Sequence, residues 1–157
     1  MKILIYHQFP SPVGLITLGI LRGSIHSVTI GKNNDITLIK RSPNKIGVQA
    51  EEQFNSYFSH DLKTFCLPIS PKGTSFQKKV WALLASIPYG HTSTYGELSK
   101  KLGTSPRAIG GACGANPINI IVPCHRVISV NGSLVGFSGG RGCTTKQFLL
   151  EHERVLT

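Results

Sequence analysis

Residues 94–117 read TYGELSKKLGTSPRAIGGACGANP, and this stretch predicts two short helices joined by a tight turn. Thr94, with a glutamate three residues later, forms a capping box that starts the first helix, and Gly103 ends it. Ser105 followed by Pro106 starts the second helix, because serine caps helices well and proline suits their first position. Two short helices at this spacing predict a helix-turn-helix, an arrangement that places a helix in a groove of DNA.

The second predicted helix consists almost entirely of small residues. In RAIGGACGANP only Arg107 carries a long polar side chain. Each glycine weakens a helix by about 1 kcal/mol relative to alanine, so this composition costs helix stability. Small residues also allow a helix backbone to lie close to another surface. That surface is either a neighbouring helix or a nucleic-acid groove that Arg107 enters, and the sequence leaves both alternatives open.

The next stretch, IIVPCHRVIS at residues 120–129, combines a strand pattern with two reactive side chains. Its β-branched residues predict a buried strand that ends or bends at Pro123. A thiol with a pKa of about 8.5 is mostly protonated at neutral pH, so Cys124 needs a base or a positive charge to react. Neighbouring residues on a regular strand point to opposite faces. His125 therefore needs a bend or a bridging water to act on Cys124.

The two side chains by themselves allow two interpretations. Cys124 and His125 are either a nucleophile with its base or a small buried thiol next to a core histidine. In the first case a carboxylate should orient the imidazole. The second half of the chain contains three carboxylates, and spacing alone does not choose among Glu97, Glu151 and Glu153.

Further helices flank these segments. Thr74 starts a helix with a second capping box, and Pro88 ends it. A loop rich in Gly and Ser spans residues 131–142. Thr144 is then expected to cap a last helix that ends near Glu153.

The first half of the sequence has a different pattern. Runs typical of strands lie at residues 3–6, 15–18 and 28–30. Turn-forming residues separate these runs, which predicts a small antiparallel sheet. A helical pattern at 48–58 and an extended piece at 64–69 follow. The predicted fold class is therefore α/β (α+β), with a sheet-plus-helix domain over 1–70 joined to a mostly helical domain with a helix-turn-helix over 74–157.

Charge and composition narrow the class of protein. The chain has 157 residues, 40% of them hydrophobic and 15% charged, which is typical of a globular protein. Its formal net charge is +10, and residues 71–157 hold ten Lys and Arg against three Asp and Glu. A basic half favours a polyanionic partner, most often nucleic acid, over a protein that is merely basic. No apolar run approaches the roughly 20 residues of a membrane span, and MKILIYHQFP is too short for a signal peptide, so we expect an intracellular protein.

The cysteines do not form a recognisable metal or disulfide pattern. They are Cys66, Cys113, Cys124 and Cys143. None belongs to a CxxC pair, and no short-range cluster of Cys and His provides the ligands of a zinc site. We therefore expect reduced thiols and no bound metal.

Several motifs in the second half occur in the order that characterises one protein family. They are Tyr95 at the start of a short helix, SPRAIGGACGANP, IIVPCHRVI, NG, GFSGG and LLEHE. Together they cover essentially all of residues 74–156 and resemble the O6-alkylguanine-DNA alkyltransferases, also called methylated-DNA–protein-cysteine methyltransferases. The first 70 residues resemble the family loosely, through a strand-then-helix layout that implies a ribonuclease-H-like arrangement.

The resemblance implies DNA repair by direct damage reversal. A methyl or larger alkyl group would move irreversibly from O6 of guanine, and from O4 of thymine, to Cys124, once per protein molecule and without a cofactor. The target base would be flipped out, because an alkyl group on O6 lies inside the base stack. The partner would be double-stranded DNA that contains O6-alkylguanine, bound through the minor groove by a monomer, with cooperativity left open. The expected location is the cytoplasm, with nucleoid association in a prokaryote.

The resemblance also assigns four catalytic residues. Cys124 would accept the alkyl group, and His125 would act on it as a base through a water. Glu153 would orient His125, and Asn116 would brace the active-site turn.

Substrate and DNA contacts follow from the same resemblance. Tyr95 would rotate the target nucleotide and bond to the base. The carbonyl of Val127 would accept from the guanine amino group, and the backbone N–H of Ser138 would donate to the alkylated oxygen. Arg107 would fill the space of the flipped base. The remaining expected contacts are Cys113 and Phe137 in the pocket, and Ser105, Ala108, Gly111 and Arg126 on DNA.

Some positions depart from the family pattern. Phe137 stands where many relatives have Tyr or another residue, and the loop is longer at 141–144. Cys113 replaces a larger apolar residue, which would admit bulkier alkyl groups.

Two alternative functions remain: a lesion-binding protein that signals to other repair factors without transfer, and a Cys-His hydrolase with multiple turnovers. The presence of Cys124 argues against the first.

Overall fold

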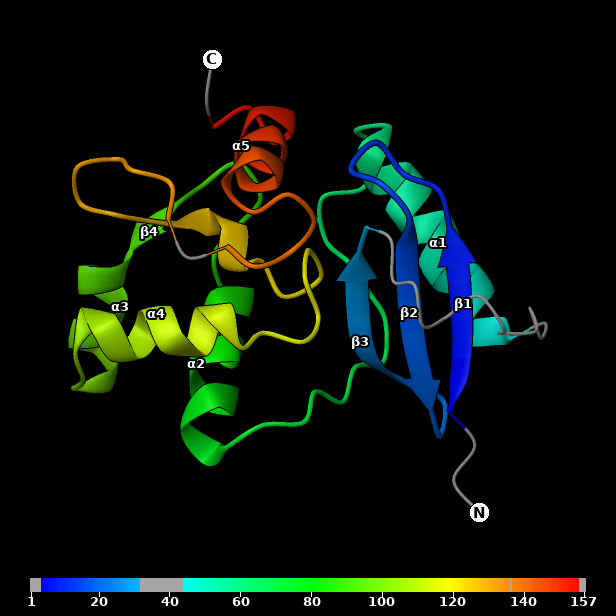
Figure 1. The fold of residues 1–157 in the computed structure, drawn as a ribbon, viewed down its shortest axis with the longest axis horizontal. Coiled ribbons are helices and arrows are strands. Elements are labelled where there is room, and N and C mark those ends of the chain that lie inside the picture. The colour runs from blue at the N-terminus through cyan, green and yellow to red at the C-terminus, as the bar shows by residue number, and fades with distance from the viewer. Residues whose placement is uncertain (1–3, 32–43, 136, 156–157) are drawn as a thin grey trace.

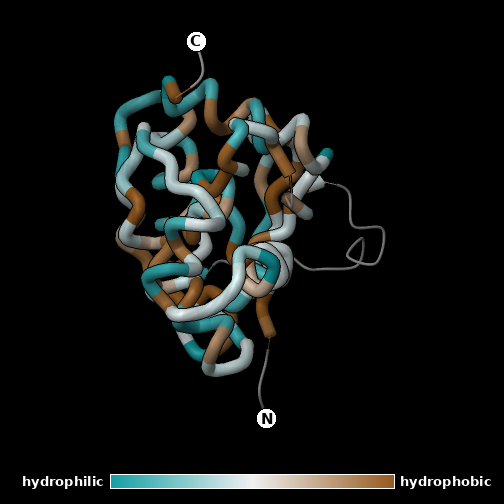
Figure 2. The backbone as a smooth tube through the Cα atoms, turned by 90° about the vertical axis from the view of Figure 1, so that its left-hand side faces the viewer, coloured by the Kyte–Doolittle hydropathy of each residue, from teal (hydrophilic) through white to brown (hydrophobic). Residues whose placement is uncertain are grey.

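The structure is a computed structural model that describes residues 4–31, 44–135 and 137–155. A three-stranded sheet with one helix forms the first half, and a group of helices forms the second, as Figure 1 shows. The predicted α+β class is confirmed. In Figure 2, hydrophobic and hydrophilic segments alternate along the helical half, as expected for helices that bury one face.

The sheet is antiparallel, with strand order β1-β2-β3. Its strands are β1 (Ile5–Phe9), β2 (Ile16–Leu21) and β3 (Ser24–Ile30). The first strand lies later than the predicted run at 3–6, of which residue 3 is outside the described residues. The central strand β2 is almost completely buried, because α1 (Lys45–Phe58) packs against the sheet. Asn44 caps α1, so the helix begins three residues before the predicted start at 48.

Three helices of the second half begin where their caps predict. They are α2 (Ser75–Ala85), α3 (Tyr95–Leu102) and α4 (Pro106–Gly114). Thr74 and Thr94 each form a complete capping box, and the Ser105 side chain accepts from the backbone of α4. Gly103 ends α3 with a φ of +63°, a conformation that glycine adopts without strain. Local sequence signals therefore determine these boundaries.

Two predictions for the second half are wrong. Residues 120–122 do not form a strand, because Ile120 has a φ of +72° and Cys124–Arg126 form a 3-10 turn. Only the short β5 (Val127–Ile128) is a strand, and it pairs in parallel with β4 (Ser93–Thr94).

The start of the last helix is the second error. This helix, α5 (Cys143–His152), begins before Thr144, and Gly142 occupies the cap position without a side-chain hydrogen bond. The hydroxyl of Thr145 accepts from the Arg141 backbone N–H instead, so it serves the preceding loop. The predicted end near Glu153 is confirmed, because Glu153 is the C-cap.

The two halves share one buried hydrophobic cluster. The outer edge of β3 pairs with the second half, where the Val28 N–H donates to the Pro117 carbonyl at 2.8 Å. The same edge pairs with Ile69, so the end of the predicted extended piece at 64–69 lies against the sheet. The domain boundary between residues 70 and 74 stays a prediction. Within the described ranges, no helix has the length and apolar character to cross a membrane.

Candidate active site

Cys124 begins the 3-10 turn and is held there by Asn116. The Asn116 side chain donates to the Val122 carbonyl at 2.9 Å and accepts from the Ile118 N–H at 3.0 Å. Asn116 is buried, so these hydrogen bonds are protected from water. One side chain thereby fixes the chain on both sides of the positive φ at Ile120. This is the geometry that the expected bracing role requires.

The thiol of Cys124 is 3% exposed, and its Sγ lies 3.6 Å from the Asn119 side-chain oxygen. Burial raises the pKa of the Cys124 thiol, although the Asn116 amide and the Lys146 ammonium oppose the effect. The thiol is therefore protonated at rest. Reaction as a thiolate requires a nearby group that accepts the proton.

His125 is completely buried and bonded to Glu153. Its Nε2 lies 2.8 Å from Glu153 Oε1, so Nε2 carries the proton and donates it to the carboxylate. Burial lowers the pKa of His125, against the opposing effect of Glu153, and the ring is neutral near pH 7. Nδ1 is buried and has no hydrogen-bond partner among the described residues. A buried imidazole nitrogen with a free lone pair is suited to accept a proton from Cys124.

Glu153 is the centre of a buried polar network. Besides His125, its carboxylate accepts from Arg126 Nε and Nη2, both at 2.9 Å, and from the Tyr57 hydroxyl at 2.8 Å. Burial alone would raise the pKa of Glu153, but hydrogen bonds from His125 and Arg126 lower it to about 2. The carboxylate is therefore ionised near neutral pH. Of the three candidate carboxylates, the structure brings Glu153 to His125, while Glu97 caps α3 and Glu151 is exposed.

Arg126 lies elsewhere than the sequence analysis expected. Its guanidinium is buried, donates to Glu153 and to the Ile87 carbonyl, and lies over the Tyr89 ring. All of these contacts are inside the protein. The expectation that Arg126 contacts DNA does not fit this placement, because its guanidinium is buried and already donates to Glu153. Breaking this buried ion pair would leave both charges without a partner.

Lys146 is a residue of the site that the sequence analysis missed. It is completely buried on α5, and its Nζ donates to the carbonyls of Val127 and Val135 and lies 3.5 Å from the Tyr95 hydroxyl. Burial lowers the pKa of Lys146. A signal was available, because Lys146 shares a helix face with Leu149 and Leu150 at i, i+3 and i+4.

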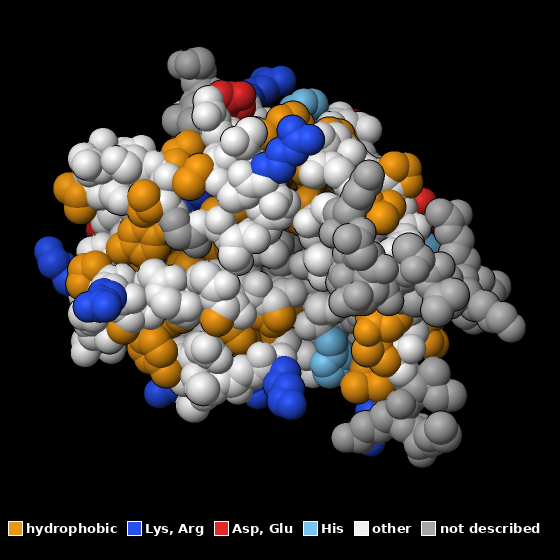
Figure 3. All heavy atoms as spheres, in the orientation of Figure 1, with side chains coloured by type: hydrophobic (Ala, Val, Ile, Leu, Met, Phe, Trp, Pro, Cys, Tyr) orange, Lys and Arg blue, Asp and Glu red, His pale blue; other side chains and the backbone are white. Residues whose placement is uncertain are grey.

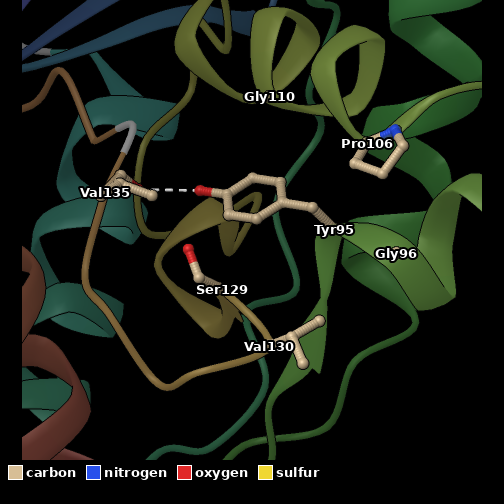
Figure 4. A pocket seen from close by; sticks show the side chains of 7 residues that line it. All are labelled: Tyr95, Gly96, Pro106, Gly110, Ser129, Val130 and Val135. Atoms are coloured by element: carbon tan, nitrogen blue, oxygen red, sulfur yellow. Dashed lines mark hydrogen bonds between the residues drawn. The ribbon is translucent and has the colours of Figure 1, made fainter.

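Tyr95 borders a mostly apolar pocket with a volume of about 480 Å³. Figure 4 shows its ring between α4 and the loop at 129–135, with the hydroxyl donating to the Val135 carbonyl at 2.8 Å. The pocket is lined by Tyr95, Gly96, Pro106, Gly110, Ser129, Val130 and Val135. Burial raises the pKa of Tyr95 to about 12, so the hydroxyl remains a neutral donor.

The other expected pocket residues lie on the loop before α5 and on α4. Cys113 and Phe137 are buried, whereas Ser138 is exposed and its hydroxyl donates to the Gly114 carbonyl at 3.1 Å. This contact attaches the loop to the end of α4. Ser138 and Cys113 therefore lie at the same, C-terminal end of α4.

Helix α4 has a buried face and an open face. On the buried face, the carbonyl of Ala112 accepts from the Trp81 indole at 2.9 Å. On the open face, Ser105, Arg107 and Gly111 are exposed, Ala108 is partly exposed, and an added Cβ at Gly111 would meet no atom within 4 Å. Packing inside the protein therefore does not explain these small residues. Figure 3 shows that Lys and Arg side chains predominate over acidic ones on the visible surface, which suits a polyanionic partner.

Among the described residues, no group of three or more His, Cys, Asp and Glu side chains is placed to hold a metal ion. All four cysteines are free thiols, and Cys66 and Cys143 are exposed. The side chains described above as able to react or to move a proton are the Cys124 thiol and the neutral His125 imidazole, with the ionised Glu153 carboxylate behind them.

Comparison with known proteins assigns the chain to a family. The family model described as 6-O-methylguanine DNA methyltransferase, DNA binding domain, matches residues 75–155. The methylated-DNA–protein-cysteine methyltransferase of Haemophilus influenzae is 36% identical over 161 residues, covering 99% of this chain and 89% of the relative. The protein of the same name from Methanosarcina acetivorans is 50% identical over 107 residues, covering 67% of each chain.

A solved structure supports the same assignment. The crystal structure of the Mycobacterium tuberculosis O6-methylguanine methyltransferase is 37% identical and has a TM-score of 0.85, covering 97% of this chain and 93% of that chain. The M. tuberculosis protein in complex with DNA matches with a TM-score of 0.83, covering 95% of this chain and 92% of that chain. The chain belongs to the 6-O-methylguanine DNA methyltransferase family.

Proposed function

We propose that this protein repairs alkylated DNA by direct reversal, through a single irreversible transfer of an alkyl group from guanine O6 to the Sγ of Cys124. The observation that carries the proposal is the arrangement of Cys124 beside His125, whose Nε2 is bonded to Glu153 and whose Nδ1 is free within the described structure. This arrangement provides a protonated thiol with an adjacent base of fixed orientation. The names of the family relatives agree with this chemistry.

The chemical step balances without a cofactor. The thiol proton passes to His125 Nδ1, directly or through a water, and leaves a thiolate. The thiolate attacks the alkyl carbon, so an S–C bond forms while the C–O6 bond breaks, and guanine leaves with the electron pair of that bond. A proton from the imidazolium then neutralises the guanine. The product is a thioether that thiols do not reverse, and each molecule reacts once.

Recognition is proposed to use α4 in the minor groove of double-stranded DNA. Its open face lets the backbone approach the groove, while Arg107 takes the place of the flipped base. Phosphate contacts from the basic half give affinity without sequence preference. The protein would act as a monomer on O6-alkylguanine, and on O4-alkylthymine, in the compartment that holds the DNA.

Binding of the base requires a rearrangement at the loop 129–135. Tyr95 is bonded to Val135, and the Val127 carbonyl already accepts from Lys146. A carbonyl oxygen has two lone pairs, so Val127 can accept from both Lys146 and a guanine amino group. Tyr95 has one hydroxyl proton and must release Val135 to donate to the base. We propose that this exchange accompanies entry of the base.

Stoichiometry tests this function. A duplex oligonucleotide with one O6-methylguanine is offered in excess, and repaired bases are counted per protein molecule. We expect a burst equal to the protein concentration and no further turnover. Continued turnover would support the Cys-His hydrolase instead, and binding without any repair would support the lesion-binding alternative.

A further inference from the structure

The first half of the chain contributes one side chain to the network behind Cys124. Tyr57 lies on α1, and its hydroxyl donates to Glu153 Oε1 at 2.8 Å, although the two residues are 96 positions apart. The same oxygen accepts from His125 Nε2 at 2.8 Å and from Arg126 Nη2 at 2.9 Å. Three donors therefore converge on one carboxylate oxygen, and one of them comes from outside the helical half.

The Tyr57 ring is firmly held. It is completely buried and packs against the rings of Phe65, Tyr89 and His152, with centroids 4.9 to 6.0 Å away. Its backbone carbonyl also accepts from His152 Nε2 at 2.8 Å. Burial raises the pKa of Tyr57, so the hydroxyl stays protonated and can only act as a donor to the carboxylate. A fixed neutral hydroxyl can hold the Glu153 carboxylate in place by donating to it, and it takes no proton from His125.

We propose that Tyr57 is a positioning residue for alkyl transfer, which holds Glu153 in the orientation that aligns His125 with Cys124. The first half of the chain thereby completes the active site. This inference rests on the proposed transfer to Cys124. Tyr57 does not touch the thiol, so it acts through Glu153 and His125.

A second contact ties the same half to the site. The β3 edge pairs with Pro117 and Ile118, directly after Asn116, which braces the Cys124 turn. The sheet-plus-helix half therefore contacts both the Glu153 carboxylate and the segment that leads into the Cys124 turn. Preorganisation by such supporting groups is what keeps reacting groups in productive geometry.

Removing the Tyr57 hydroxyl should change the pH dependence of the reaction. The donor withdraws negative charge from the Glu153 carboxylate, so its loss strengthens the interaction of Glu153 with His125. This raises the pKa of His125, whose protonation removes the base, and the acid limb of the rate profile moves to higher pH. The titratable and charged groups around this carboxylate are His125, Arg126, Tyr57, Tyr89, His152 and Arg154. The Tyr57→Phe substitution removes only the Tyr57 hydroxyl from this set of groups, and it keeps the aromatic ring.

The experiment measures single-turnover alkylation of Cys124 by free benzylguanine as a function of pH. For Tyr57→Phe we expect a rate about tenfold lower near neutral pH, since a hydrogen bond to a charged group is lost, and an acid limb at higher pH. Tyr6→Phe is the matched control, because it removes a hydroxyl from the edge strand β1 of the same half. Its profile should match that of the unmodified protein.

A double-mutant cycle tests whether Tyr57 acts through the carboxylate. In a Glu153→Gln background, Tyr57→Phe should cause no further loss. An equal loss in both backgrounds would overturn the inference, as would a Tyr57→Phe profile identical to that of the unmodified protein. If unmodified protein does not react at all, the proposed function fails instead.

A variant with the same shape covers the case in which Tyr57→Phe does not fold. Tyr57→3-fluorotyrosine has a more acidic hydroxyl and is a stronger donor. It should move the acid limb to lower pH. An unchanged acid limb in this variant would overturn the inference.

Discussion

His125 Nε2 and Glu153 Oε1 lie 2.8 Å apart inside the protein, and this contact determines which ring nitrogen remains for Cys124. Because Nε2 carries the ring proton and donates to the carboxylate, Nδ1 is left as the acceptor. The sequence analysis left open whether the imidazole and the thiol of adjacent residues act together. Cys124–Arg126 form a 3-10 turn and not a strand. The side chains of Cys124 and His125 are therefore not forced to opposite faces by the backbone.

Stability should depend on Glu153 and His125 at acid pH. Glu153 has a lowered pKa, so its contribution is fully present above about pH 4.5 and is lost as pH falls towards 2. The drop from 4.5 to about 2 corresponds to about 3 kcal/mol. His125 also has a lowered pKa, so protonation of the unfolded chain below about pH 6.5 acts in the same direction.

Urea unfolding between pH 7 and pH 3 checks this prediction. The free energy of unfolding should decrease with pH, and Glu153→Gln should flatten the part below pH 4.5. A Glu153→Gln protein with the same acid dependence as the unmodified protein would show that other carboxylates are responsible. Glu52→Gln is a control, because Glu52 is exposed on α1.

Lys146→Met should destabilise the protein and slow alkyl transfer. The change removes the Lys146 donor from the Val127 carbonyl and leaves the Val135 carbonyl with the Tyr95 hydroxyl alone, and an unpaired buried acceptor costs about 1–3 kcal/mol. It also removes the positive charge that favours the Cys124 thiolate. Thermal unfolding and the single-turnover rate with benzylguanine measure the two effects. Lys79→Met, on the exposed face of α2, should stay within about 0.5 kcal/mol of the unmodified protein, and an equal loss there would count against the role of Lys146.

Arg107→Ala should impair repair of duplex DNA far more than reaction with free benzylguanine. Base flipping costs a few kcal/mol, so loss of the side chain that replaces the base should slow duplex repair by about ten- to hundredfold. Both rates are measured in single turnover. Lys45→Ala, which removes an exposed charge from α1, controls for net charge. Equal slowing with both substrates would contradict the proposed role of Arg107.

Gly111→Leu should have opposite effects on folding and on DNA binding. The position is open, so the added Cβ meets no protein atom within 4 Å, and leucine improves helix propensity by up to about 1 kcal/mol relative to glycine. On DNA the same side chain would block close approach of α4. Thermal unfolding and fluorescence anisotropy with a labelled duplex measure the two properties. Unchanged affinity would show that this face of α4 does not lie against DNA.

The sequence predicts those parts of the structure that depend on local contacts. Thr74, Thr94 and Ser105 each bond to backbone within three residues, and each predicted cap is present. The start of α5 was predicted wrongly, because the helix begins at Cys143 and Gly142, rather than Thr144, occupies the cap position.

Long-range contacts explain what the sequence could not show. The contact between Tyr57 and Glu153 joins residues 96 positions apart. Lys146 donates to one carbonyl in β5 and to another in the loop before α5. Neither pairing leaves a pattern in the nearby sequence. The burial of Arg126 could not be predicted for the same reason, because it depends on the distant Glu153 as a partner for the charge. The resemblance to the alkyltransferase family implied that Glu153 orients His125. The 2.8 Å distance between the two side chains comes from the structure.

The most direct test of the account is peptide mass spectrometry after reaction with a duplex that contains O6-methylguanine. We predict a gain of one methyl group on the peptide that contains Cys124, with Cys66, Cys113 and Cys143 unmodified. Cys124→Ser should bind the same duplex without gaining mass. Methylation at another cysteine, or loss of the DNA methyl group with Cys124 unmodified, would contradict the assignment of Cys124 as the acceptor.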